Sequence, residues 1–135
     1  MLKKQIDYGL HDAYIYDILL EENGISLLFN DGVYLLDENG KETQLSAPCK
    51  MLINVENFDK SKIYAHCDFR KTHKNRFKNI EFTDLKKLLL KDKINIDLDF
   101  YSPFAQAISI KGTICRCFIE LTIYDVVSIE FIFNN

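Results

Sequence analysis

The chain has 135 residues and a formal net charge of −3, and 47% of its residues are hydrophobic. This length fits one domain, over residues 1–135, and the composition excludes a disordered, collagen-like or low-complexity chain. No apolar run approaches the roughly 20 residues that a membrane-spanning helix needs, so we expect no membrane partner.

Residues 1–7 lack the uninterrupted apolar stretch of a secretory signal. Cys49, Cys67, Cys115 and Cys117 all lie in strand-like runs, where an unpaired cysteine behaves as a small buried hydrophobe. Without an export signal, reduced thiols are favoured over disulfides. We therefore expect a cytoplasmic protein with four reduced cysteines.

Three turn dipeptides follow one another early in the chain: Asn23-Gly24, Asp31-Gly32 and Asn39-Gly40. Such pairs supply the positive φ angles of tight hairpin turns. The apolar segments 13–20, 25–30 and 33–37 lie around them. This spacing predicts a β-meander of about four antiparallel strands.

The middle of the chain changes period. Apolar and polar residues alternate over 51–56 and 62–69, as in half-buried strands. Residues 83–91 carry a helical stripe instead, and Thr83 is the expected N-cap. The stripe consists of Leu85, Leu88 and Leu89.

Strand-like alternation resumes from residue 94 to the C-terminus. The apolar face of the first of these strands is expected to hold Ile94, Ile96, Leu98 and Phe100, with Asp97 and Asp99 sharing the polar face. Lys111-Gly112 predicts a turn, and Tyr124-Asp125 a bend between the strands at 115–123 and 127–133.

These elements predict a mainly β (α+β) fold. We expect a curved antiparallel sheet or a partly open barrel of about 8–10 strands, with one helix near residues 83–91. The long last strand would present an exposed edge, so a monomer or a homodimer is expected.

Acidic residues predominate in the meander, which has only one lysine between residues 5 and 49. An acidic surface speeds association with a basic partner, and tyrosine is enriched at interface hot spots. The expected protein-binding residues are therefore Asp31, Asp37 and Glu38, with the outward-facing Tyr14, Tyr16 and Tyr34.

Basic residues gather instead in residues 60–93, which hold 11 of the 17 Lys and Arg residues. They peak in the segment 70–78, which contains Arg70, Lys71, Lys74, Arg76 and Lys78. This segment could bind an anion or a nucleic acid, with Phe77 available for base stacking. A solvated loop that joins a strand to the helix is favoured over such a site, and the net negative charge disfavours nucleic acid as the partner.

A pocket inside the partial barrel is the other candidate site. His66, Asp68 and Tyr64 share one face of a predicted strand, and His11 would have to lie near them. His66-Cys67 and Cys115/Cys117 lack the spacing of a zinc site. No phosphate loop or catalytic signature is present, so we expect no metal and no cofactor and assign no catalytic residue.

The segment Leu10-His11-Asp12-Ala13-x-Ile15, followed by Ile25 to Phe29 and Asp31-Gly32, resembles the start of certain small bacterial proteins of unknown function. In these proteins a Leu-His-Asp-Ser/Ala-x-Ile start leads into an antiparallel meander, and some are similar to immunity proteins of bacterial toxin systems. The resemblance covers residues 10–32. It implies an intracellular, non-enzymatic binding protein, with His11 and Asp12 in structural or interface positions.

Three functional hypotheses follow. The first is an immunity-type protein that neutralises a protein partner through an acidic antiparallel sheet. The alternative is a small-molecule-binding or hydrolytic domain with a pocket in the partial barrel. The second alternative is nucleic-acid binding through residues 70–78.

Overall fold

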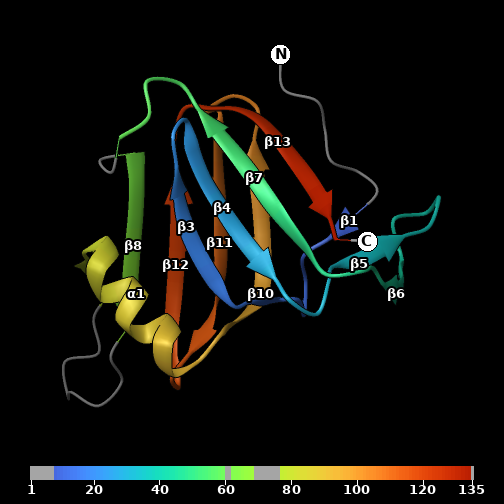
Figure 1. The fold of residues 1–135 in the computed structure, drawn as a ribbon, viewed down its shortest axis with the longest axis horizontal. Coiled ribbons are helices and arrows are strands. Elements are labelled where there is room, and N and C mark those ends of the chain that lie inside the picture. The colour runs from blue at the N-terminus through green and yellow to red at the C-terminus, as the bar shows by residue number, and fades with distance from the viewer. Residues whose placement is uncertain (1–7, 60–61, 69–76, 135) are drawn as a thin grey trace.

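The computed structural model describes residues 8–59, 62–68 and 77–134. Two large antiparallel sheets form two layers, and a small third sheet lies beside them (Figure 1). No sheet in the described part of the chain closes on itself. The predicted mainly β fold with one helix is confirmed, in the form of a layered sandwich rather than a barrel.

The front layer in Figure 1 has the strand order β13-β7-β4-β3. Its strands are β3 (Asp17–Glu21), β4 (Gly24–Phe29), β7 (Cys49–Val55) and β13 (Val126–Phe133). The back layer has the order β2-β10-β11-β12-β8-β9. Its strands are β2 (Tyr14–Ile15), β8 (Ile63–Asp68), β9 (Phe77–Ile80), β10 (Ile94–Ser102), β11 (Ala107–Ile114) and β12 (Cys117–Ile123).

The third sheet consists of β1 (Tyr8–Gly9), β5 (Tyr34–Leu36) and β6 (Glu42–Leu45), in the order β1-β5-β6. It lies near the C-terminal end of β13 (Figure 1). The ring of Tyr8 packs on Phe131 and Phe133, with centroid distances of 4.9 and 5.2 Å. This aromatic cluster joins the third sheet to the front layer.

The core lies between the two large sheets and follows the predicted alternation in most strands. In β7 every second residue is buried, and the same holds for β12. Fully buried side chains come from both layers, among them Leu27, Phe29, Ile53, Ile110 and Leu121. Each layer therefore removes the apolar face of the other from water.

The single helix in the described residues, α1 (Phe82–Lys91), contacts β3 of one layer and β8 of the other. Leu85 is fully buried, and Lys86 Nζ lies 2.6 Å from Asp17 Oδ1 and 3.0 Å from the carbonyl oxygen of Ile18. The helix therefore closes one side of the sandwich. This helix of ten residues is far shorter than a bilayer-spanning one, and no described helix is long and apolar enough to cross a membrane.

The N-terminus of α1 differs from the prediction by two residues. Glu81, not Thr83, is the N-cap, because the Asp84 carboxylate accepts a hydrogen bond from the Glu81 backbone N–H at 3.3 Å. A carboxylate in the first turn takes up an amide that the helix itself leaves unpaired.

A bulge in β10 overturns the predicted face of that strand. The pairing with β11 shifts between Ile96 and Leu98. Beyond the shift, Leu98 and Phe100 are 56% and 62% exposed, although Ile96 is fully buried. Because one extra residue reverses the alternation, Asp97 and Asp99 do not share a face. A similar shift in β13, between Val126 and Ser128, leaves Val127 exposed.

The turn predicted at Lys111-Gly112 is also wrong, because both residues lie within β11. A Cβ atom at Gly112 would lie 2.1 Å from the carbonyl oxygen of Asn95 on β10, so the glycine permits close strand approach. The chain turns instead at Cys115 and Arg116, which have φ values of 50° and 65°. The described residues contain 13 strands, more than expected, since several have only two to four residues.

Because α1 closes the sandwich, we expect the free energy of unfolding to fall strongly when Leu85 is shortened and little when Leu90 is shortened. Leu85→Ala removes a fully buried side chain between the layers and should lower the free energy of unfolding by about 3 kcal/mol. Leu90, on the same helix, is 87% exposed, and Leu90→Ala should change the free energy of unfolding by about 0.5 kcal/mol or less. Urea unfolding followed by circular dichroism measures both. Equal effects would show that α1 does not close the core.

Candidate functional site

A hollow of about 290 Å³ lies where the third sheet meets the two layers. It is lined by Asp12, Ala13, Tyr14, Asp31, Gly32, Tyr34 and Leu45. We call it the tyrosine hollow. Its residues come from the start of β2, the β4–β5 turn, β5 and β6, so segments more than 30 residues apart in the sequence build it together.

The β4–β5 turn places Asp31 at the hollow. The Gly32 N–H donates to the carbonyl oxygen of Phe29 at 3.0 Å, and Gly32 has a φ of +83°. The Ser46 hydroxyl accepts a hydrogen bond from the Val33 N–H at 3.0 Å. A Cβ atom at Gly32 would lie 2.2 Å from the carbonyl oxygen of Ser46. Only glycine permits both this φ and this close approach.

A chain of polar contacts orders the tyrosines beside the hollow. The Tyr16 hydroxyl donates to Asp31 Oδ2 at 2.7 Å, and Lys93 Nζ donates to the Tyr16 hydroxyl at 3.3 Å. The same Nζ lies 4.6 Å from the ring centroid of Tyr14 and 5.0 Å from that of Tyr16. The hydrogen bond with Tyr16 raises the pKa of Lys93, and the negative charge of Asp31 adds to the rise. Lys93 therefore stays charged and holds both rings by cation–π attraction.

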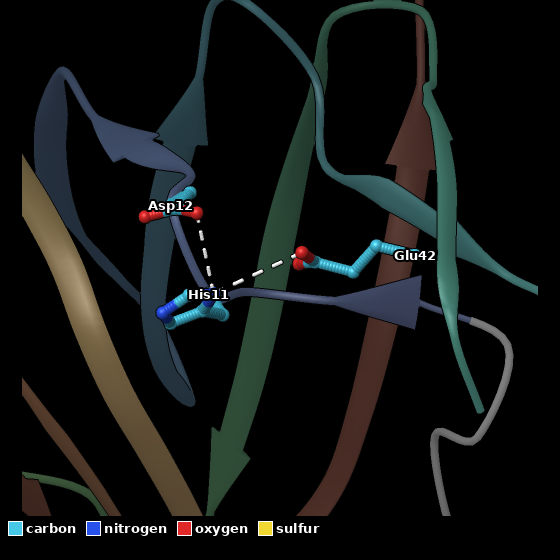
Figure 2. Close-up of side chains that lie close together, drawn as sticks. All are labelled: His11, Asp12 and Glu42. Carbon is cyan, nitrogen blue, oxygen red and sulfur yellow. Dashed lines mark ion pairs between the residues drawn. The ribbon is translucent and has the colours of Figure 1, made fainter.

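His11 lies between two carboxylates next to the hollow (Figure 2). His11 Nδ1 is 3.3 Å from Asp12 Oδ2 and 3.8 Å from Glu42 Oε1. The backbone N–H of Asp12 donates to the carbonyl oxygen of Ile96 at 2.8 Å, which fixes the turn that carries both His11 and Asp12. Glu42 Oε2 is buried and has no hydrogen-bond partner among the described residues.

These three side chains are the ones that could hold a metal among the described residues. Their candidate donor atoms lie within 4.8 Å of one another, and one imidazole with two carboxylates is a suitable donor set for a divalent cation. The His11 and Asp12 side chains are 58% and 56% exposed. Direct contacts of His11 with both carboxylates explain the same arrangement without a metal.

Asp99 joins this region because of the bulge in β10. Its register partner is the buried Ile110, so its side chain points to the inner side of the sheet, near His11. Partial burial raises the pKa of Asp99, although a hydrogen bond from its own backbone N–H and the charge on His11 oppose the rise. Its side chain still contacts solvent.

The predicted acidic residues separate into two places. Asp31 lines the tyrosine hollow, whereas Asp37 and Glu38 lie at the tip of the β5–β6 hairpin. Asp37 Oδ1 accepts hydrogen bonds from the N–H groups of Asn39 and Lys41, at 2.8 and 2.9 Å. Asp37 therefore shapes the hairpin turn, and Glu38 is exposed beside it.

The predicted pocket residues are not brought together. His66 and Tyr64 lie on β8, while His11 precedes β2, and β10, β11 and β12 lie between those two strands. Tyr64 contacts Tyr124 edge-to-face, with a centroid distance of 5.2 Å. A second hollow of about 360 Å³ lies between β8, β9 and α1, and Tyr64 lines it without His66. Asp68 belongs to β8, but its side chain lies outside the described residues.

The predicted basic segment is outside the structural description. Arg70, Lys71, Lys74 and Arg76 lie in the range 69–76, and the side chain of Lys78 in β9 is likewise not described. All four cysteines carry reduced thiols, and three of them are buried. Burial raises the pKa of the Cys49 thiol, as expected for a packed cysteine.

No family model matches the chain, and the comparisons with curated proteins and with solved structures gave no significant match.

Two residues of the site escaped the sequence analysis. Lys93 follows α1 and reaches Tyr16, which lies 77 residues earlier. Leu45 lines the hollow from β6. A lysine after a helix and an exposed leucine carry no local signal of such a role, because only the tertiary fold places them beside the tyrosines.

The role of Gly32 can be tested against a second glycine with positive φ. Gly40 has a φ of +76°, and a Cβ atom there would have no neighbouring atom within 4 Å, so Gly40→Ala should cost about 1 kcal/mol from backbone strain alone. Gly32→Ala adds the clash with Ser46 and should cost more than about 2 kcal/mol. Urea unfolding measures both, and equal losses would show that the turn does not need the close approach.

The raised pKa of Asp99 makes its ionised form unfavourable in the folded state. That penalty is absent when the pH is below the ordinary aspartate pKa, and it is complete when the pH is above the raised pKa of Asp99. Asp99→Asn should therefore increase stability at pH 7 by about 0.5 kcal/mol or less, because the group is solvent-accessible, and leave it unchanged near pH 3. Asp97→Asn removes the same charge nearby and is the control in thermal unfolding. A stabilisation that persists at pH 3 would contradict this origin.

Proposed function

We propose that this protein is a non-enzymatic binding protein of the immunity type, which recognises a basic protein partner through the tyrosine hollow and the acidic residues around it. The observation that carries the proposal is the convergence of Tyr14, Tyr34 and Asp31 at one hollow, with Tyr16 beside it as the hydrogen-bond donor to Asp31. Tyr14, Tyr16 and Tyr34 come from two separate strands and the residue between β2 and β3.

The charge around the hollow supports a basic partner. Asp12 and Asp31 line the hollow, and Glu42 and Asp99 lie near the adjacent His11, whereas Lys93 is the lysine beside the site. Such a field attracts a positively charged surface over long range and raises the association rate.

The tyrosines support an interface rather than a merely solvated acidic surface. Tyrosine provides a large contact area with little loss of side-chain freedom, and Tyr16 is already fixed by Asp31 and Lys93. A fixed side chain loses less entropy when it is buried by a partner. The immunity-type role, with a toxin as the neutralised partner, comes from the resemblance of residues 10–32.

The proposal is tested by affinity capture from lysate with and without nuclease, followed by calorimetry with the purified retained protein. Asp31→Asn and Tyr34→Ala should each raise the dissociation constant at least about tenfold, since each removes a central contact. Binding should also weaken as salt increases.

Glu22→Gln is the matched control, because it removes one acidic charge at the exposed β3–β4 turn, at the other end of the front layer. It should leave the dissociation constant within about twofold of the wild-type value. If Asp31→Asn and Glu22→Gln had the same effect, or if only nuclease-sensitive material were retained, the proposal would be wrong.

A further inference from the structure

We infer that the tyrosine hollow is a receptor for one arginine side chain of the partner, whose guanidinium group lies against Tyr34 and pairs with Asp31 and Asp12. This inference rests on the proposed function, because it names the chemical group that the binding site takes up. Four observations lead to it: the size of the hollow, the chemistry of its lining, the ordering of Asp31, and the position of Lys93.

The size of the hollow fits one side chain. Its volume of about 290 Å³ lies just below the range of about 300–1,000 Å³ that is typical of small-molecule pockets. Asp12 and Asp31 are both exposed at this site, so a side chain carried on the surface of another protein can reach them.

The lining has the chemistry of a cation site. Two aspartates and two tyrosines line the hollow, and none of the described residues that line it is basic. Carboxylates attract a cation by charge, and a tyrosine ring attracts it through the negative face of the ring. Among protein side chains, this combination selects arginine or lysine.

Asp31 is ordered to receive a planar group. Tyr16 donates to its Oδ2 at 2.7 Å and so holds this oxygen in place, which leaves Oδ1 to accept a hydrogen bond from a ligand. A guanidinium group presents several N–H donors in one plane and stacks on aromatic rings, whereas an ammonium group is a compact, strongly hydrated charge. A fixed carboxylate beside an aromatic ring therefore favours arginine over lysine.

Lys93 shows the same chemistry on the adjacent side of the site. Its ammonium group lies near the rings of Tyr14 and Tyr16 and near the acceptor Tyr16 hydroxyl. Lys93 is not among the residues that line the hollow. It thus occupies the cation position on those two rings, and Tyr34 is the ring left for an incoming cation.

The test uses three small probes in ¹H–¹⁵N NMR titrations of the full chain: the Nα-acetyl methylamides of arginine, lysine and citrulline. Citrulline has nearly the shape of arginine but no charge. We expect the arginine probe to give saturable shifts at the amides of Asp31, Gly32 and Tyr34 at concentrations up to about 20 mM, as befits a single-side-chain contact. The lysine probe should bind at least about fivefold more weakly, and the citrulline probe should not saturate.

Variants assign the shifts to the hollow. Asp31→Asn and Tyr34→Leu should each weaken arginine binding at least about fivefold, whereas Tyr34→Phe, which keeps the ring, should retain it. Glu38→Gln removes an exposed charge at the hairpin tip and should have no effect. Each variant is shown to be folded if its spectrum matches that of the wild-type protein at the amides away from the hollow.

The outcomes separate this inference from the proposed function. No saturable shift at the hollow, or equal shifts with arginine and citrulline, would overturn the arginine site. If the purified partner still depended on Asp31 and Tyr34, the proposed function would stand without it. If arginine bound but no partner depended on these residues, the proposed function would fall.

Discussion

Neither large sheet could be stable alone, because each carries a continuous apolar face that must be removed from water. β4, β7 and β12 place buried residues at almost every inward position, and the two layers cover one another. A two-layer sandwich leaves its sides open. Here α1 closes one side of the sandwich through Leu85. The aromatic cluster around Tyr8 joins the third sheet to the front layer. The rest of the structure follows from the need to bury these two faces.

The tyrosine hollow lies where this closure is made from short and irregular pieces. β2 has two residues, β5 has three, and the β4–β5 turn needs a glycine with positive φ. Backbone that leaves the regular sheet pattern can present side chains from several segments to one point. Binding residues are accordingly common on loops that a rigid scaffold positions. The hollow therefore results from the short strands and turns that complete the sandwich beside the third sheet.

Period-two alternation predicted most of the strands because burial on one face of a sheet repeats every second residue. It failed in β10, where the bulge at Ile96/Leu98 reverses the alternation without any change in the sequence pattern. Gly112 was taken for a turn residue, although its function is to let Asn95 on β10 approach. A local pattern cannot distinguish these uses of glycine, since the neighbouring strand decides between them.

The candidate site was predictable only in part for the same reason. Outward parity and composition pointed to Tyr14, Tyr16, Tyr34 and Asp31, which meet at the hollow or, for Tyr16, beside it. Asp37 lies in the same acidic segment of the sequence, but its carboxylate accepts hydrogen bonds from the backbone of its own turn. His11 and His66 were grouped by chemistry, and the strand order separates them. Residue type was thus informative about chemistry, whereas proximity depended on the topology.

The charges at the site imply a balance between stability and recognition. Asp12 and Asp31 line the hollow, Glu42 and Asp99 lie near the adjacent His11, and burial makes the ionised form of Asp99 unfavourable. Lys93 offsets part of this negative charge, because it lies close enough to Asp31 for the pKa of Lys93 to rise, and His11 contacts two of the carboxylates. The remaining negative charge has no lysine or arginine ion-pair partner among the described residues. A positively charged partner would relieve it on binding, so the electrostatic cost that the free protein bears becomes part of the driving force for association.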